Sequence, residues 1–479
     1  MKMKFIIGLS SLLVTIMLLV SSCSSDNATP PPKFYFKASD TTSSATSIAD
    51  LFGAAVTISG DGNTLAIGAW AEDSDGSADT DNAADGAGAV YVFKRSTTGG
   101  VISWSQVRYV KAPPQIAGDN FGFSVSLSKD GNRLAVGAPG KDIGGVNTNE
   151  GAVYVYSAPN YDTPTLVTAI GGQNDDRFGE SIALSGDGLR LAVGAILEDG
   201  GAGDPATSSG AVYVYTDGLG NGTSWTEENI LYAPTPQANA NLGVSVALNQ
   251  DGSVLAAGAW REDDLAANDD RGAAYMFVRT AGPTWSAGTQ LKASDRADDD
   301  RFGVSIALSD DGTRLAIGAP GDFLGMGGFT GAAYVFTCSI PPTCSEEAII
   351  TASNSDVDDA FGIAVALSSS GNTLLVGASY EDGSEVDTSA TPDNLASNAG
   401  AAYRFTRAAG PPATWTQINY IKATNTDAGD SFGTDVAISD NGSRIVVGAS
   451  GEDSNATGVD GDQTNDTATD AGAAYLWNL

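Results

Sequence analysis

The chain contains no histidine, only three cysteines, and far fewer basic than acidic residues. Without histidine it lacks the commonest general base of enzymes, and so few thiols leave no ligand set for a zinc site. Its 24 Lys and Arg against 58 Asp and Glu give a net charge of −34, and a surface of that sign repels nucleic acid. We therefore expect no nucleic-acid partner and no enzyme. The same charge attracts cations, although solubility outside the cell explains it equally well.

Long apolar runs are also scarce. The one at the N-terminus, Phe5–Val20 after Lys2 and Lys4, is too short and wrongly flanked for a comfortable membrane span and is typical of an export signal. It ends in Val20-Ser21-Ser22-Cys23, which resembles the lipobox of bacterial lipoproteins. That resemblance implies a signal peptide over residues 1–22 and a lipidated Cys23. An ordinary secretory signal with a chance cysteine is the alternative.

The residues after Cys23 are polar and end in prolines, so residues 23–32 are expected to form a flexible spacer. Extended, Ser24–Pro32 reaches on the order of 30 Å. We expect an exported protein held by its lipid alone on the bacterial outer membrane or cell surface.

The two remaining cysteines are Cys338 and Cys344, with Pro341-Pro342 between them. They flank a turn between two strand-like runs, Ala332–Thr337 and Glu347–Thr351. Because export favours oxidation and hairpin flanks lie within bridging distance, we predict a disulfide between them.

Beyond the spacer, one motif occurs seven times: an apolar residue followed by glycine, and a Gly-Ala step fifteen residues after that glycine. This spacing never changes, whereas successive copies stand 57 to 71 residues apart. A constant core with elastic loops is typical of repeat architectures. The two steps of each copy are Phe52-Gly53 with Gly68-Ala69, Phe121-Gly122 with Gly137-Ala138, Phe178-Gly179 with Gly194-Ala195, Leu242-Gly243 with Gly258-Ala259, Phe302-Gly303 with Gly318-Ala319, Phe361-Gly362 with Gly377-Ala378, and Phe432-Gly433 with Gly448-Ala449.

Each copy has the pattern of four antiparallel strands in about 60 residues. In the second copy apolar residues alternate with serines up to Leu127, and Asp130-Gly131 then favours a tight hairpin. The third strand, residues 151–156, is apolar on both faces and must be covered on both. Because no helical run is available to cover it, we predict sheets stacked on sheets: an all-β, seven-bladed propeller.

The two ends of this region complement each other. The last copy stops after its third strand, at Tyr475–Leu479. Residues 33–38 form an orphan strand that matches the fourth strands ending in Lys111-Ala112 and Lys422-Ala423. We therefore predict that the N-terminal strand joins the last blade and closes a single propeller over residues 33–479.

The repeat resembles the FG-GAP family, the unit of the seven-bladed propeller in integrin alpha subunits and of many bacterial surface proteins. Only Gly137–Pro139 and Gly318–Pro320 carry a literal Gly-Ala-Pro, but seven phased copies make the match specific. In integrins, the resemblance implies, ligands bind the face formed by the strand 4–1 and strand 2–3 connections. In this chain nearly all length variation falls on those connections. Loops of variable length on a rigid scaffold usually carry binding.

The same connections carry aspartates at repeated positions. One set stands two residues before the apolar residue of the first step: Asp50, Asp119, Asp176, Asp300, Asp359 and Asp430, with Ala240 as the exception. The other set stands five residues after the Gly of Gly-Ala: Asp73, Asp142, Asp199, Asp263, Asp382 and Asp453, whereas the fifth copy has Asp322 one place earlier.

Two interpretations of these aspartates stay open. They could gather Ca²⁺, which prefers oxygen ligands, or each could accept backbone N–H bonds within its own turn. The nearest approach to a calcium loop is Asp73-Ser74-Asp75-Gly76, followed by Asp79 and Asp81. The resemblance implies calcium between strands one and two, but here those hairpins are too short. Any calcium site must therefore use the strand 2–3 loops.

Function follows as a hypothesis: a monomeric, lipid-anchored surface module for adhesion or recognition of a protein or glycan. Trp70 and Trp260 could contact the partner, or they could fill the position between blades that proline occupies elsewhere. A carboxylate-dependent glycosidase or lyase and a structural component of an envelope assembly are the alternatives.

Overall fold

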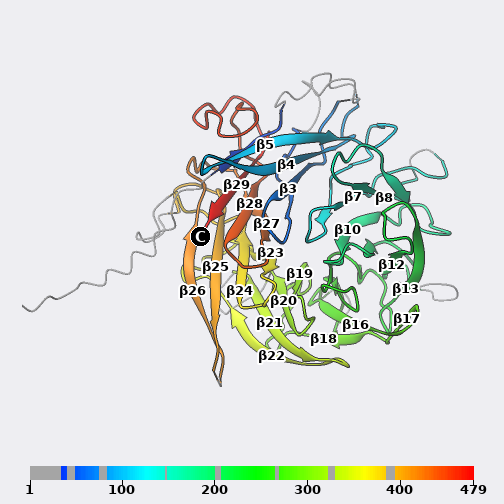
Figure 1. Ribbon diagram of the computed structural model, residues 1–479. Helices are drawn as coiled ribbons and strands as arrows, with labels where there is room; N and C mark the ends of the chain where they lie inside the picture. The colour runs from blue at the N-terminus through cyan, green and yellow to red at the C-terminus, as the bar shows by residue number, and fades with distance from the viewer. Residues whose placement is uncertain are drawn as a thin grey trace, which may run out of the picture.

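The computed structural model describes residues 34–39, 49–74, 84–145, 148–199, 206–264, 269–321, 330–384, 394–410 and 412–479. Within these ranges every regular element longer than a turn is a β-strand, and no helix there is long and apolar enough to cross a membrane. The strands form seven antiparallel sheets arranged as blades around one axis (Figure 1). The predicted seven-bladed β-propeller is confirmed.

The blades follow one another along the chain, and each runs outward from its first strand near the axis. Blades 1 to 3 consist of β2 (Ala55–Ile58), β3 (Thr64–Ala69), β4 (Ala89–Thr98) and β5 (Val101–Val110); β6 (Val125–Leu127), β7 (Arg133–Ala138), β8 (Ala152–Ser157) and β9 (Thr165–Val167); and β10 (Phe178–Leu184), β11 (Arg190–Ala195), β12 (Ala211–Asp217) and β13 (Trp225–Leu231).

Blades 4 to 7 repeat the pattern with one interruption, in the fourth strand of blade 4. They consist of β14 (Val246–Leu248), β15 (Val254–Ala259), β16 (Ala273–Ala281), β17 (Thr284–Trp285) and β18 (Thr289–Leu291); β19 (Ser305–Leu308), β20 (Arg314–Ala319), β21 (Ala332–Ser339) and β22 (Thr343–Ile350); β23 (Phe361–Leu367), β24 (Thr373–Ala378), β25 (Ala401–Ala408) and β26 (Thr414–Ile421); and β27 (Phe432–Ile438), β28 (Arg444–Ala449), β29 (Ala473–Asn478) and β1 (Phe34–Phe36).

The repeated motif is scaffold, as its composition predicts. Phe302 is fully buried and meets Tyr334 edge to face at 5.3 Å between ring centroids. The glycines let neighbouring blades approach closely: a Cβ on Gly318 would stand 1.9 Å from the carbonyl oxygen of Gly362 in the next blade. At such a distance the backbone would have to move, so only glycine fits.

The ring closes where β1 pairs with β29. Phe34 lies opposite Leu476 and Tyr35 opposite Tyr475. The Tyr35 hydroxyl donates to Glu452 at 2.9 Å, which fixes the N-terminal strand to blade 7. The predicted closure by the N-terminal strand is confirmed.

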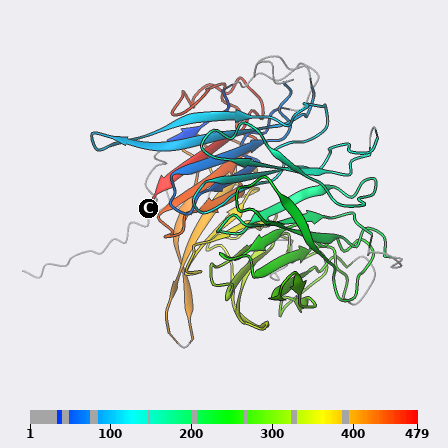
Figure 2. The same cartoon turned by 45° about the vertical axis from the view of Figure 1, so that its right-hand side comes forward.

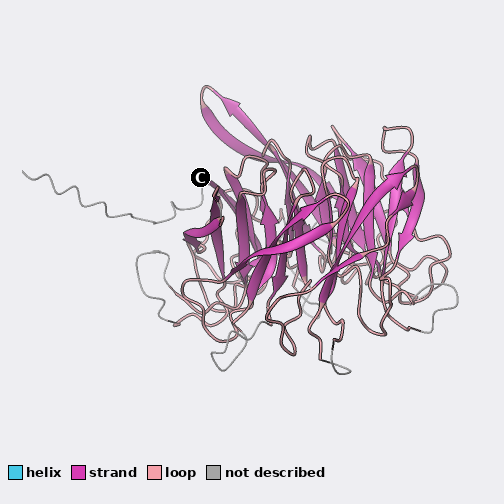
Figure 3. Ribbon diagram, turned by 90° about the horizontal axis from the view of Figure 1, so that it is seen from below, coloured by secondary structure: helices cyan, strands magenta, loops and turns pink. Residues whose placement is uncertain are grey.

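The two ends of the propeller differ. We call the end with the strand 1–2 and strand 3–4 connections the hairpin face, and the end with the strand 2–3 and strand 4–1 connections the loop face. Seen from the side, loops gather along one edge and a strand hairpin projects from the other (Figure 3).

At the axis, the tight strand 1–2 turns form a belt of backbone hydrogen bonds around the hairpin face. One of them joins the last blade to the first, from Asp440 N–H to Gly60 O at 3.0 Å. Lys129 crosses the axis there, with Nζ 2.6 Å from Asp440 Oδ1 and bonded to Asp310 as well. This end of the propeller is therefore tied together across blades 2, 5 and 7.

The predicted disulfide is present. Cys338 and Cys344 are bonded, with 4.0 Å between their Cα atoms. They lie opposite each other within β21 and β22, because both strands extend further toward the turn than the sequence pattern indicates.

Candidate functional site

The first set of aspartates is buried on the loop face. Asp50, Asp119, Asp176, Asp300, Asp359 and Asp430 are each 3 % exposed or less. In four of them the carboxylate accepts the N–H of the residue three positions earlier: Asp176 from Gln173, Asp300 from Ala297, Asp359 from Asp356 and Asp430 from Asp427. These aspartates shape the turn that enters each blade, so they are not displayed as a ring of free carboxylates.

Asp119 differs because it faces a cation. Lys141 Nζ lies 2.8 Å from Asp119 Oδ2, and both side chains are buried. The carboxylate is therefore paired inside the protein.

The second set closes the strand 2–3 loops. In the six pairs described, the carboxylate accepts a hydrogen bond from a backbone N–H near the end of the same loop, two positions before the glycine that begins strand three. The residue that donates this N–H has positive φ in all six pairs. The pairs are Asp73 with Gly86, Asp142 with Asn149, Asp199 with Ser208, Asp263 with Asp270, Asp382 with Asn398 and Asp453 with Asp470. This hydrogen bond joins the first and last residues of the loop, so the two loop ends are held in the same way whatever the length between them.

Among the described residues, no three Cys, Asp or Glu side chains come together as a metal site. Asp75, Asp79 and Asp81 lie outside those residues. One observation fits a cation at this loop: Asp73 is 1 % exposed, and its Oδ2 has no hydrogen-bond partner in the part of the chain that is described. The other aspartates of the described ranges do not converge, and calcium binding stays a prediction.

Sequence reasoning missed a set of buried ion pairs beside these aspartates. Glu381 stands next to Asp382, and its Oε2 lies 2.9 Å from Lys422 Nζ at the end of β26. Glu452 pairs in the same way with Lys37 at 2.7 Å. A third pair joins Glu72 and Lys111. The signal is present in the sequence, as a recurrent Glu before the second aspartate and a recurrent Lys-Ala after the fourth strand.

Blade 3 has the glutamate without the lysine, since Tyr232 takes the lysine position. Glu198 accepts a hydrogen bond from Tyr213 at 2.8 Å and also contacts Asp176. Burial, together with the neighbouring Asp176 charge, raises the pKa of Glu198 to about 7.

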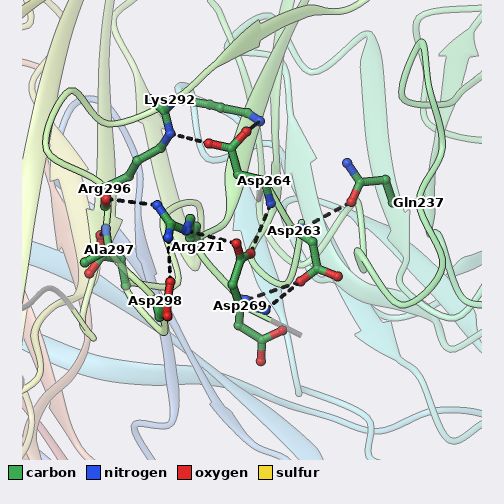
Figure 4. Close-up of polar contacts among 11 residues, drawn as sticks. Gln237, Asp263, Asp264, Asp269, Arg271, Lys292, Arg296, Ala297 and Asp298 are labelled. Carbon is green, nitrogen blue, oxygen red and sulfur yellow. Dashed lines mark hydrogen bonds and ion pairs between the residues drawn. The ribbon is translucent and has the colours of Figure 1, made fainter. Parts of the chain in front are cut away.

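Blade 4 has a network of charged residues around a polar cavity of about 220 Å³ (Figure 4). Asp264 accepts from Lys292 at 2.9 Å and also binds Arg296. The residues that line the cavity include Thr235, Gln237, Glu262 and Gln290. Amide, hydroxyl and carboxylate groups of this kind can bind a hydroxylated ligand.

Trp70 and Trp260 are half-buried. Trp70 packs on Phe123 of the next blade, with 5.9 Å between ring centroids. Trp260 lies between Arg261 and Arg301, whose guanidinium carbons are 4.5 and 5.7 Å from its ring centroid. Each tryptophan therefore packs between blades, and a role in partner binding stays a prediction.

The seam between blades 5 and 6 holds a more apolar hollow. A cavity of about 290 Å³ is lined by Arg301, Pro320, Ile363 and Tyr380, among others. Tyr380 is 51 % exposed, and Leu395 on the same strand 2–3 loop is 78 % exposed. Sequence reasoning missed this region, because exposed apolar loop residues carry no periodic signal.

The comparisons with known proteins agree with the fold. A family model described as FG-GAP repeat matches residues 104–156, 165–215, 225–277, 285–336, 344–405 and 415–477. Each segment runs from the fourth strand of one blade to the third strand of the next, so the sequence unit straddles two blades.

No curated protein matches the chain significantly. Among solved structures, hydrazine synthase from Kuenenia stuttgartiensis is similar, with 12 % identity, a TM-score of 0.49, and coverage of 84 % of this chain and 94 % of that one. A likeness at this level implies nothing about function. The six matched segments cover most of the sequence, and the chain belongs to the FG-GAP repeat family.

Proposed function

We propose that this protein is a lipid-anchored binding module of the bacterial surface and that its loop face recognises a protein or a glycan. The FG-GAP propeller fold suggests an interaction or adhesion module. The surface location and the lipid anchor are inferred from the sequence around Cys23.

One observation carries the proposal: a rigid ring holds its longest and most variable loops, the strand 2–3 connections, on one face. In blades 1 to 4, 6 and 7 the aspartates of the second set fix both ends of the strand 2–3 loop by one hydrogen bond, whatever the loop contains. The strand 1–2 turns on the opposite face, by contrast, have the same length in every blade, and the strand 3–4 connections beside them vary by only a few residues. Large variation concentrated on one face of a fixed scaffold is the arrangement of a binding surface.

The groups exposed on this face suit a macromolecular ligand. Tyr380 and Leu395 offer apolar area, and Arg301 beside them is exposed. Aromatic and arginine side chains contribute most of the binding energy in many protein interfaces. The polar cavity of blade 4 adds groups that suit a sugar hydroxyl.

The experiment that tests the proposal is a screen of the purified mature protein against glycan and envelope-protein arrays. Hits are then measured with Tyr380→Ala and Leu395→Ser, and with Leu219→Ser as the matched control. Leu219 is 70 % exposed but lies in the strand 3–4 connection of blade 3, on the hairpin face. We expect the loop-face variants to lose binding at least tenfold and the control to retain it. Binding that Leu219→Ser alone weakens would reject the loop face.

The anchor is tested separately. Cys23→Ala should release the protein from membranes and abolish incorporation of a clickable palmitate analogue. A Cys23→Ala protein that stays with the membrane would contradict a lipid anchor.

A further inference from the structure

We propose that the hairpin face rests on the lipid surface that carries the anchor, and that the loop face points away from the membrane. This orientation rests on the proposed lipid anchor. It assigns a second contact surface, whose partner is the headgroup region of a bilayer.

The direction of β1 determines at which face the N-terminal segment leaves the propeller. Its first residue, Phe34, lies opposite Leu476, close to the C-terminal Leu479, whose N–H bonds to Ser443 O in the β27–β28 hairpin. At the other end, Lys37 N–H bonds to Gly458 O in a loop-face connection. The strand therefore runs from the hairpin face to the loop face, and the chain preceding Phe34 leaves at the hairpin face.

The tether, the segment between Cys23 and Phe34, is short compared with the propeller. Between Cys23 and Phe34 the chain has ten residues, which reach on the order of 35 Å when fully extended. A tether of this length starts at the hairpin face and keeps that face near the bilayer. The loop face could reach the same bilayer only if the whole propeller turned over on its tether.

Several hairpin tips are uncharged and expose apolar side chains. Four of the strand 3–4 tips, over residues 96–103, 281–284, 339–343 and 408–414, contain no charged residue, whereas the strand 1–2 turns nearer the axis carry aspartates such as Asp61, Asp130 and Asp187. The β4–β5 hairpin projects well beyond its blade (Figure 2) and has Val101 near its tip, 70 % exposed. Ile340 at the β21–β22 turn is 46 % exposed. Uncharged tips with exposed apolar residues can enter a headgroup layer without burying a charge.

The loop face has the opposite character. Its three longest loops, 70–87, 379–399 and 450–471, contain six, five and six acidic residues and no lysine or arginine. An anionic bilayer repels such loops over about a Debye length, roughly 10 Å at ordinary ionic strength. The four uncharged tips of the hairpin face do not suffer this repulsion, so the two faces are not interchangeable.

The experiment measures which face lies near lipid in the mature lipidated protein. The protein is placed in vesicles of phosphatidylcholine and phosphatidylglycerol, and an environment-sensitive dye is attached to Val101→Cys or to Leu395→Cys. Since Cys338 and Cys344 form a disulfide and Cys23 carries the lipid, the new cysteine is the only thiol available. Both positions are exposed and should tolerate the change.

We expect lipid-attached nitroxide to quench the dye at Val101→Cys several-fold more than the dye at Leu395→Cys, and aqueous iodide to show the reverse order. Co-flotation with the vesicles is recorded in the same samples. Protein that floats but shows equal or inverted quenching would overturn the orientation and leave the anchor standing. Protein that does not float would overturn the anchor and, with it, this orientation. A dye at Val101→Cys that is shielded from iodide in native membranes but not quenched by lipid would indicate a protein partner and would likewise overturn the proposal.

Discussion

Buried lysine–glutamate pairs should be costly to disturb in this fold. In blade 6, Lys422 and Glu381 are about 1 % and 3 % exposed at their side chains and lie 2.9 Å apart. Burial lowers the pKa of Lys422, although Glu381 opposes that effect. An ion pair of this kind does not need to add much net stability, yet removing one partner leaves a charge in a low-dielectric interior.

Lys422→Met should therefore lower the free energy of unfolding by about 3–5 kcal/mol. The matched control is Arg108→Met, which breaks an ion pair with Asp162 whose side chains are 41 % and 49 % exposed. That loss should be below about 1 kcal/mol. Urea titrations of both variants give the comparison, and equal losses would contradict the buried-pair argument.

The turn aspartates predict a dependence of stability on pH. Burial, together with the nearby Glu452 and Asp427, raises the pKa of Asp430 to about 8, whereas an unfolded aspartate titrates near 4. The folded state thus holds this proton more tightly than the unfolded state. The stability is present at low pH and is lost as pH rises through about 8.

We expect the melting temperature of the wild-type protein to fall between pH 6 and pH 9, and that of Asp430→Asn to fall less. Asparagine can keep the bond from Asp427 N–H through its oxygen. As a control, Asp61→Asn changes a carboxylate whose hydrogen bonds lower its pKa, so it should leave the slope in this range unchanged. Parallel slopes for wild type and Asp430→Asn would show that Asp430 is ionised throughout.

At the scale of the element, the strands were predictable and the contacts of the loops were not. Alternation over 121–127 and the Asp130-Gly131 turn fix a hairpin locally, because side-chain period and turn geometry depend on neighbours in sequence. The Lys111–Glu72 pair joins residues 39 positions apart, and the Lys37–Glu452 pair joins residues 415 apart. Recognising such pairs requires knowing which strand ends meet, which the periodic pattern does not state.

The role of the repeated aspartates likewise could not be predicted from the sequence. Their repetition predicted where they stand, but both roles stayed open in the sequence. The bond from Asn398 N–H to Asp382 depends on the positive φ of Asn398, which closes the loop base. A carboxylate's hydrogen bonds follow backbone geometry that composition alone does not define.

The close approach of neighbouring blades gives a prediction about glycine. Gly318→Ala would place a Cβ 1.9 Å from Gly362 O, and we expect a loss of about 3 kcal/mol or more of unfolding free energy, at the upper end of overpacking costs. Gly218→Ala is the control, since its Cβ would meet nothing within 4 Å; it should change stability by about 1 kcal/mol or less. Chemical denaturation separates the two, and a Gly318→Ala protein of wild-type stability would contradict this account of blade packing.

The calcium hypothesis belongs to one loop. If a cation satisfies Asp73 Oδ2 together with the following aspartates, millimolar calcium should raise the melting temperature by a few degrees over chelator. The triple change Asp75→Ala, Asp79→Ala and Asp81→Ala should remove that shift and leave the fold intact. The absence of a shift in the wild-type protein would leave all these carboxylates as turn-formers and solubilising groups.

At the scale of the molecule, the seven-bladed ring could be derived from sequence because each copy repeats the same short-range signals. Closure was predictable as well, since β1 supplies the one strand that blade 7 lacks. That the long acidic loops share one face, in contrast, becomes apparent only once strand order shows which connections lie at the same end. The direction in which β1 pairs with β29 determines which face lies near the anchor. The proposed contact of the hairpin face with lipid depends on that pairing.

Hydrogen exchange followed by mass spectrometry tests that pairing directly in the unmodified protein. The account predicts that a peptide covering residues 34–38 exchanges as slowly as one covering residues 473–478, because both belong to one sheet with a buried Tyr35–Tyr475 contact. Exchange of residues 34–38 within seconds, while 473–478 stay protected, would contradict the closed ring and the assignment of faces that follows from it.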